Sequence, residues 1–391
     1  MVRILKRISL SLAKQFTSIG GQAVIEGVMM RSPNAFVVAV RKPDGKIRLR
    51  RDQWYGISQK LSFMKKPFLR GVVMLIEAMA NGVVSLNYSA NIAMDEELKA
   101  EALKKGKTVE QFEAEKKAKE KIDWQTYLTI ATSFAFGMGL FVFVPHAATE
   151  GLNQWFSFGW DLDGFAFHAI DGFIKACVFI LYIGLIGLIP DIRRVFQYHG
   201  AEHKSISTFE AGEDLTVENA RKYTTLHPRC GTSFIFFVLF ISIILFSVLF
   251  VIIPVESWVN TWIPQGGTGF VAERIYPNIK HVVAIFIKIP LMLPVAGISY
   301  EIIKFAGKHA GNPLCKALSM PGMMLQKLTT KEPDDQQLEV ALASIKAVLF
   351  LEEKYELKQK SEKVLQVEEV DIDSIAAMES TNSTLGDFLE S

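Results

Sequence analysis

The sequence predicts an all-α polytopic membrane protein of about four transmembrane helices, with a small N-terminal cytoplasmic β element and one interfacial or re-entrant helix. Half of the 391 residues are hydrophobic and only 21% are charged, so the chain is more apolar than an ordinary soluble protein. The apolar residues gather in runs that reach the ~20 residues needed to cross a bilayer. Four such runs cover about residues 126–146, 165–190, 232–254 and 281–304.

Basic residues are unevenly divided between the connections, and their distribution predicts the topology. Segments 99–121, 191–231 and the chain after residue 305 are rich in lysine and arginine, whereas 147–164 has none and 255–280 has only two. Basic loops stay on the cytoplasmic side of a membrane. We therefore expect a cell-membrane protein with a membrane domain over 124–305 and with both termini and the 191–231 loop in the cytoplasm.

The N-terminal part is also predicted to be cytoplasmic. Residues 1–18 form a basic amphipathic segment, which favours a membrane-surface helix over the alternative, a targeting segment. Residues 19–70 are expected to hold a glycine-rich loop and a β-hairpin. The apolar run 35–40 and the basic run 46–50 flank the sequence Pro-Asp-Gly, as two strands flank a tight turn.

Residues 71–94 are apolar enough to be counted as a fifth span, but we predict an interfacial or re-entrant helix instead. At helical spacing Glu77, Asn81, Tyr88 and Asn91 form a polar stripe on an otherwise apolar helix. A fifth span would also export the basic residues that precede it, contrary to the positive-inside rule. The stripe is expected to face protein or a wet cavity.

The remaining segments are predicted to lie in the cytoplasm. Residues 95–123 read as a charged, solvated helix with a spacer role. Residues 306–366 are expected to form C-terminal helices, and the acidic tail 367–391 is expected to be disordered. A net charge of +2 argues against a nucleic-acid partner, which leaves membrane lipid and a membrane-protein or peptide substrate.

The sequence YHGAEHK at 198–204 places two histidines four residues apart with a glutamate between them. On a helix His199 and His203 would share one face and could bind one cation. The order H-x-x-E-H is that of the inverted zincins, in which the glutamate activates water. We therefore expect zinc, or another divalent transition metal, on His199 and His203, with Glu202 as general base.

Zinc needs at least one further protein ligand. The inner ends of the third and fourth predicted spans offer Glu301, His227 and Cys230, with His309 as a further neighbour. The alternative is that the histidines bind neighbouring groups or lipid headgroups without a metal. A site of this kind can also be structural and closed rather than catalytic.

A second polar group lies near the outer ends of the predicted spans. Because its spacing follows no rule for metal ligands, we predict aromatic-belt and surface roles for its histidines and aspartate. The two lysines inside the spans fit snorkelling to the outer surface, an internal ion pair with Asp171 or Glu77, or a transport path. The residues are His146, His168, Asp171, His281, Lys175 and Lys288.

Four blocks of the chain resemble the signature blocks of one protein family. They are GGQAVIEGVMMR (20–31), YHGAEHK (198–204), HPRCGTSF (227–234) and the pair Tyr300 and Glu301. In this order they are similar to the YqhQ family of bacterial membrane proteins, a family of unknown function that is labelled metal-dependent from its motifs. The resemblance runs from about Gly20 to about Leu325 and implies a multi-pass bacterial inner-membrane protein.

The resemblance implies a role for the residues inside these blocks. They are Glu26, His199, Glu202, His203, His227, Cys230 and Glu301. The glycine-rich block could fold back as a loop and bring Glu26 or Arg31 to the site. The alternative is a turn packed on the β element.

Two functions of different classes follow from these patterns. The first is an integral-membrane metalloenzyme, hydrolytic in type, acting on a peptide or lipid-linked group at the cytoplasmic interface. The second is a non-catalytic membrane-protein biogenesis or scaffold factor with at most a structural metal. A transporter built around Lys175 and Lys288 is a third and weaker interpretation, because the sequence has no inverted repeat.

Overall fold

The computed structural model describes residues 19–54, 56, 62–105, 108, 124–262, 276–309, 312–358 and 367–378. The predicted amphipathic segment 1–18 lies outside these residues. So do nearly all of 106–123 in the predicted charged helix, residues 359–366, and the end of the acidic tail after residue 378.

The N-terminal β element is present and is larger than the predicted hairpin. Strands β1 (Gly20–Val24), β2 (Gly27–Arg31), β3 (Ala35–Arg41) and β4 (Ile47–Gln53) pair in sequence order, each antiparallel to the next. The strand β5 (Glu368–Ile372) adds to the far edge beside β4.

The glycine-rich block forms β1 and β2, so the prediction of a loop there is wrong. Glycine occurs where the sheet leaves no room for a side chain. A Cβ on Gly27 would lie 2.1 Å from the carbonyl oxygen of Ala39, and one on Gly21 would lie 2.7 Å from that of Met29. The tight turn between the strands requires a positive φ of 50° at Glu26, in the left-handed region.

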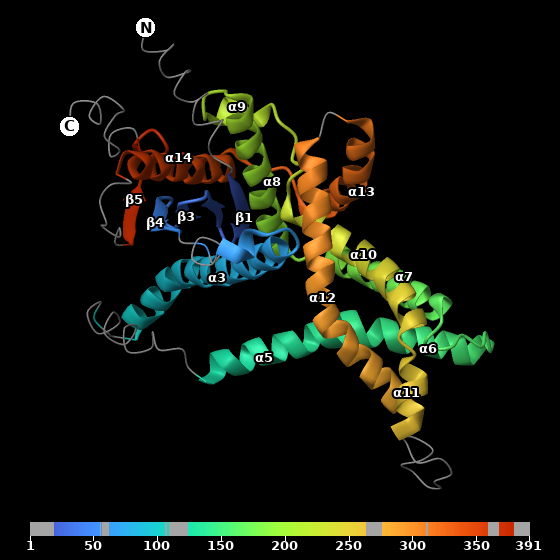
Figure 1. Cartoon of the computed structure of the whole chain (residues 1–391). Helices are drawn as coiled ribbons and strands as arrows, with labels where there is room; N and C mark the ends of the chain where they lie inside the picture. Colours follow the sequence, from blue (N-terminus) through green and yellow to red (C-terminus); the bar gives the residue numbers. More distant parts are fainter. Residues whose placement is uncertain are drawn as a thin grey trace.

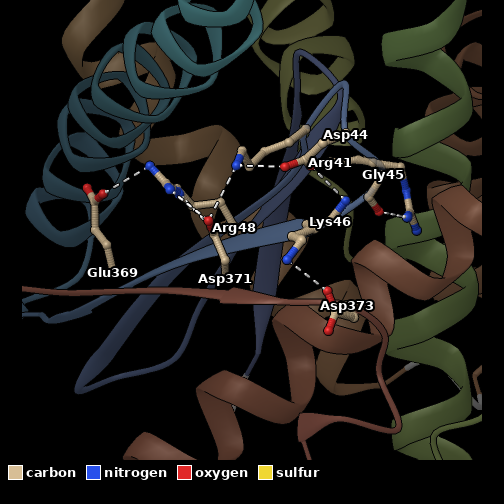
Figure 2. A network of polar contacts seen from close by, with 9 residues as sticks. Arg41, Asp44, Gly45, Lys46, Arg48, Glu369, Asp371 and Asp373 are labelled. Atoms are coloured by element: carbon tan, nitrogen blue, oxygen red, sulfur yellow. Dashed lines mark hydrogen bonds and ion pairs between the residues drawn. The ribbon is translucent and has the colours of Figure 1, made fainter. Parts of the chain in front are cut away.

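The prediction of disorder over 367–391 is wrong for its first residues, because Glu368–Ile372 is strand β5. The acidic side chains of β5 pair with the basic ones of β4: Arg48 donates to Asp371 over 2.6 Å and lies 3.8 Å from Glu369 (Figure 2). Ile372 is buried in the core. A cross-strand ion-pair ladder and one apolar anchor therefore hold a segment whose composition suggested disorder.

The sheet is covered on both faces, as Figure 1 shows. Helix α14 (Asp335–Lys358) packs on one face and α3 (Leu69–Lys104) on the other. Val37 and Ala39 join the core with α14, whereas Phe36, Val38 and Val40 point toward Ile92 of α3. This alternation is the period of two that a strand imposes on its side chains. Helix α8 (Pro190–Ala211) contacts β1 at the other edge of the sheet.

Beyond the sheet the described chain is helical. Helices α5 (Trp124–Met138) and α6 (Val144–Phe156) are joined by the π-helical turn η2 (Gly139–Phe143). The other long apolar helices are α7 (Phe165–Ile186), α10 (Gly231–Ile252) and α12 (Tyr276–Lys308). The shorter elements are η1 (Ser62–Lys65), α9 (Val217–Arg221), α11 (Val255–Trp262) and α13 (Pro313–Thr329).

Five described helices are long and apolar enough to cross a membrane. Four correspond to the predicted spans, and the fifth is Leu69–Met94 within α3. The polar stripe of α3 is buried against the sheet: Glu77 pairs with Arg31, and Gln22 donates to the carbonyl of Ala78. Asn91 is exposed and does not belong to the buried stripe. The helix continues to Lys104, so the boundary predicted at residue 94 is not a break.

Candidate functional site

Helix α8 places His199 and His203 one turn apart on the same face. The helix begins at Pro190, whose fixed φ suits a first helical position, and ends at Gly212 with φ 73°. The centroids of the two imidazole rings are 4.5 Å apart. Gly200 lies between them because the chain at Lys331 passes so close that a Cβ would be 2.1 Å from its carbonyl oxygen.

Cys230 completes the group from another element. It caps the N-terminus of α10, and its Sγ lies 3.2 Å from Nε2 of His199. One ligand atom from each of His199, His203 and Cys230 can be chosen so that all three lie within 4.8 Å of one another. Among the described residues this is the group with the spacing of a metal site.

Hydrogen bonds fix the orientation of both imidazoles. Nδ1 of His199 lies 2.9 Å from the carbonyl oxygen of Thr329, and Nδ1 of His203 lies 2.6 Å from that of Thr225. A carbonyl oxygen only accepts, so each Nδ1 carries the proton and each Nε2 presents a lone pair. Metal-binding histidines are commonly held in this way.

The Nε2 atom of His203 is buried and has no hydrogen-bond partner among the described residues. Burial also lowers the pKa of His203 to about 3, so the ring is neutral at physiological pH. Burial raises the pKa of the Cys230 thiol. Two imidazoles and one thiol suit zinc or a similar transition metal, provided that the thiol loses its proton on binding.

Glu202 is buried beside this group. Burial raises the pKa of its carboxyl to about 8, while nearby His199 acts in the opposite direction. The Gly21 backbone of β1 provides a hydrogen bond to the carboxylate, and Oε2 has no partner in the described part of the chain. Glu202 is thus a protonatable group near two of the candidate ligands, His199 and Cys230.

His227 lies next to the group without joining it. Its ring centroid is 5.7 Å from that of His203, and its Nε2 lies 3.4 Å from a carboxylate oxygen of Glu210. The backbone of His227 is held at both ends: its N–H donates to Oε1 of Gln326, and its carbonyl accepts from Nε2 of Gln326, both over 2.8 Å. Burial lowers the pKa of His227 to about 4.

Glu301 is engaged away from the candidate metal group. Its carboxylate accepts two hydrogen bonds from the guanidinium of Arg70 and one from the backbone N–H of Phe68. His309 is exposed, with Nδ1 beside the carbonyl oxygen of Phe305.

Glu26 and Arg31 also fall outside the group. Glu26 forms a bidentate pair with Arg194 and accepts a hydrogen bond from Tyr198. Arg31 pairs with Glu77 and lies 4.4 Å above the ring of Trp54. The glycine-rich block does reach the site, but through Gly21. Glu26 therefore connects the turn between β1 and β2 to α8, and Arg31 connects β2 to α3.

Sequence reasoning missed the residues that support the site. Thr225 and Thr329 act through backbone carbonyls, which no side-chain pattern reveals, and Gln326 acts from α13. Beside these segments lies an open pocket of about 550 Å³. It is lined by Tyr223, Thr224, Thr225, Leu226, Lys327, Thr330, Lys331 and Glu332.

The second polar group is buried, so the predicted surface roles for its histidines are wrong. Nζ of Lys288 lies 2.7 Å from a carboxylate oxygen of Asp171, which is one of the pairings the sequence allowed. His146 faces His281 over 3.0 Å. These residues lie at the end of α7 and α12 remote from the His199 group, because α7 runs from Phe165 toward α8.

The five long apolar helices indicate a multi-pass membrane protein, and a five-stranded sheet is attached to them. The chain belongs to the family described as "Protein of unknown function (DUF1385)", whose profile matches residues 66–350. It is 36% identical over 351 residues to "Uncharacterized protein YqhQ" of Bacillus subtilis (strain 168). The aligned region covers 87% of this chain and 95% of that protein. The resemblance to the YqhQ family is confirmed. No solved structure matches.

Proposed function

We propose that this protein is an integral-membrane, metal-dependent hydrolase whose metal is bound by His199, His203 and Cys230. The observation that carries the proposal is the buried Nε2 of His203, which has no hydrogen-bond partner among the described residues although His203 belongs to a group with the spacing of a metal site. Three protein ligands leave a fourth position open, as in catalytic zinc sites. When bound, zinc would acidify water and polarise a carbonyl or phosphoryl oxygen.

Glu202 is the proton-transferring residue of this proposal. Its Oε2 is the atom that takes a proton from the attacking water and returns it to the leaving group. Burial alone would keep the carboxyl protonated at neutral pH, and a cation nearby lowers that pKa toward neutrality. The Gly21 backbone holds the other side of the carboxylate in place.

The substrate is expected to be a peptide or lipid-linked group that reaches the site from the membrane surface. Cys230 caps the apolar helix α10, so the candidate ligands lie at the level where this helix begins. The neighbouring pocket carries Lys327 and Lys331, which suit a carboxylate or phosphate on the substrate. In this proposal the protein resides in the cell membrane with both termini in the cytoplasm.

Helix α3 is proposed to lie in the membrane surface rather than across the bilayer. Its polar side chains contact the sheet, whereas apolar side chains are exposed on the opposite side, as on an interfacial helix. Figure 1 shows α3 lying along the sheet. The exposed apolar residues are Ile76, Met79, Val83, Leu86 and Met94.

The second candidate is a scaffold or biogenesis factor with a structural metal. The burial of His203 and Glu202 favours it, because structural sites are closed to substrate. The exposed apolar side of α3 would then bind partner proteins within the membrane surface.

Metal analysis of the purified chain in detergent tests the proposal. We expect about one zinc ion per chain, lost in the His199→Ala, His203→Ala double variant and retained in His309→Ala, whose exposed histidine is the matched control. Full zinc occupancy in the double variant would contradict the ligand assignment.

Glu202→Gln separates the two candidates. Under the hydrolase proposal it keeps zinc and fold but fails to complement a strain that lacks the protein. Under the scaffold interpretation complementation is unchanged. The Glu301→Gln variant is the control, because that carboxylate is bound to Arg70.

A further inference from the structure

The membrane domain contains a second buried polar group that the proposed hydrolase does not use. Asp171 of α7 and Lys288 of α12 form an ion pair of 2.7 Å, and both side chains are almost fully buried. Lys175, one turn along α7, lies 3.8 Å from the same carboxylate. Charges inside an apolar helix domain are costly, and where they occur they usually mark an ion or proton site.

Four buried polar atoms of this group lack hydrogen-bond partners among the described residues: Nδ1 of His146, both ring nitrogens of His168, and Oδ1 of Asp171. The carbonyl of Leu162 lies near the His168 ring without meeting the geometry of a bond to either nitrogen. In a dry interior each such atom is destabilising, because it has lost its hydrogen bonds to water. Native proteins normally satisfy such groups with internal water or a ligand.

A chain of titratable side chains connects this interior to the surface. Glu150 of α6 is partly exposed and lies 3.9 Å from Nε2 of His281. Nδ1 of His281 lies 3.0 Å from Nε2 of His146, one turn before Glu150. The ring of Phe167 lies between the two histidines, with its centroid 5.1 Å from that of His146 and 5.6 Å from that of His168. His168 and Lys288 both lie against the ring of Phe250. The series therefore leads inward from Glu150.

The walls of the group are aromatic and the helices that carry it are irregular. The ring of His168 lies 4.2 Å from Phe250, and Nζ of Lys288 lies 5.6 Å from the same ring. The π-helical turn η2 comes just before His146, and Pro290 lies inside α12 two residues after Lys288. Both irregularities are frequent at functional sites in helices.

We propose that His146, His168, Asp171 and Lys288 form a hydrated proton-binding site, entered from the membrane face opposite the His199 group. A proton from water enters through Glu150, His281 and His146 and is taken by His168. The product is an imidazolium next to Asp171, so no other atom is transferred. Lys175 of α7 is a further charged group at the site, 3.8 Å from the Asp171 carboxylate, and α10 contributes Phe246 and Phe250. This inference does not depend on the zinc site.

Thiol labelling in liposomes tests the hydration. His168→Cys in a Cys177→Ser background is treated with a membrane-impermeant cationic methanethiosulfonate. We expect labelling from the face opposite the His199 group, at least ten times the background of the parent. Phe173→Cys is the control on the same helix, because Phe173 is exposed on the apolar surface and should stay unlabelled in a bilayer. An unlabelled His168→Cys protein that folds would overturn the proposal.

Hydrogen exchange at the imidazole C2 position provides a second test, measured first on the wild-type protein and then on the Asp171→Asn variant. We expect His168 and His146 to exchange in D₂O with a sigmoidal pH dependence. Asp171→Asn should lower the His168 midpoint by about one pH unit or more, because the anion that favours the imidazolium is gone, and should leave exposed His309 unchanged. Absence of exchange at both histidines, or a midpoint insensitive to Asp171→Asn, would overturn the proposal.

Discussion

Gly21 of strand β1 lies against the carboxylate of Glu202 in helix α8: a Cβ at residue 21 would be 2.9 Å from Cδ of Glu202. The edge of the sheet and the candidate catalytic helix are therefore in direct contact, although Gly21 and Glu202 are 181 positions apart in the sequence. The sheet positions the carboxyl group that the proposed reaction requires.

Gly21→Ala is expected to displace Glu202 and to destabilise the protein by about 1–3 kcal/mol, since the new methyl group overpacks a full site. The measurement is the melting temperature in detergent together with zinc content. Gly20→Ala is the matched control, because a Cβ there meets nothing within 4 Å. Equal stability of the two variants would show that the contact with Glu202 is looser than we describe.

Gln326→Ala is expected to cost about 1–3 kcal/mol, because it leaves the buried N–H of His227 without its acceptor and removes one of two hydrogen bonds to the His227 carbonyl. Zinc content should be unchanged, since Gln326 bonds to the backbone of His227 and to Ser233 rather than to the ligands. Gln154→Ala, on an exposed pair with Glu150, is the control with little effect. Complete loss of zinc in Gln326→Ala would mean that His227 takes part in metal binding and does not merely pack beside the ligands.

Glu301→Gln tests whether the inner end of α12 takes part in metal binding. We expect full zinc content and a stability loss of no more than about 1 kcal/mol, because the Glu301–Arg70 pair is partly exposed. Zinc loss in this variant, measured by the same metal analysis, would indicate that Glu301 is a metal ligand. That result would contradict its assignment as the partner of Arg70.

Asp371→Asn is expected to loosen β5 by removing the bidentate partner of Arg48 (Figure 2). The pKa of Asp371 is lowered, chiefly by Arg48, so the pair stabilises the strand above the ordinary aspartate pKa and the effect is lost as the pH falls below about 4. Amide exchange across Glu368–Ile372 should therefore be faster in the variant at pH 7, with the difference closing near pH 3.

A neighbouring pair provides the control for this prediction. Asp373→Asn removes a pair with Lys46 in which both side chains are largely exposed, and such pairs contribute little. If Asp373→Asn accelerates exchange as much as Asp371→Asn does, the ion-pair ladder is not what holds β5.

The sequence indicated those features that depend on local periodicity. The four apolar runs, the strands on either side of Pro43–Gly45 and the shared face of His199 and His203 all follow from spacing along the chain. The polar stripe of α3 was recognised for the same reason. The sequence did not show that this stripe contacts the sheet, which only the structure reveals.

The features that were missed depend on packing between distant segments. The sequence offered three alternative third ligands at the inner ends of the spans and did not distinguish between them. In the structure Glu301 is bound to Arg70 and the backbone of His227 is bound to Gln326, whereas Cys230 contacts His199. Strand β5 was missed because its stability comes from the basic side chains of β4. The buried state of His168 depends on how α7 packs on α10, which spacing does not encode.

The most direct test of the metal site is the spectrum of the cobalt-substituted protein. We predict tetrahedral cobalt absorption with a near-ultraviolet sulfur-to-cobalt charge-transfer band, and the loss of that band in Cys230→Ser but not in Cys315→Ser, whose buried thiol lies outside the group. A charge-transfer band that survives Cys230→Ser, or a wild-type chain that binds no cobalt, would contradict the account.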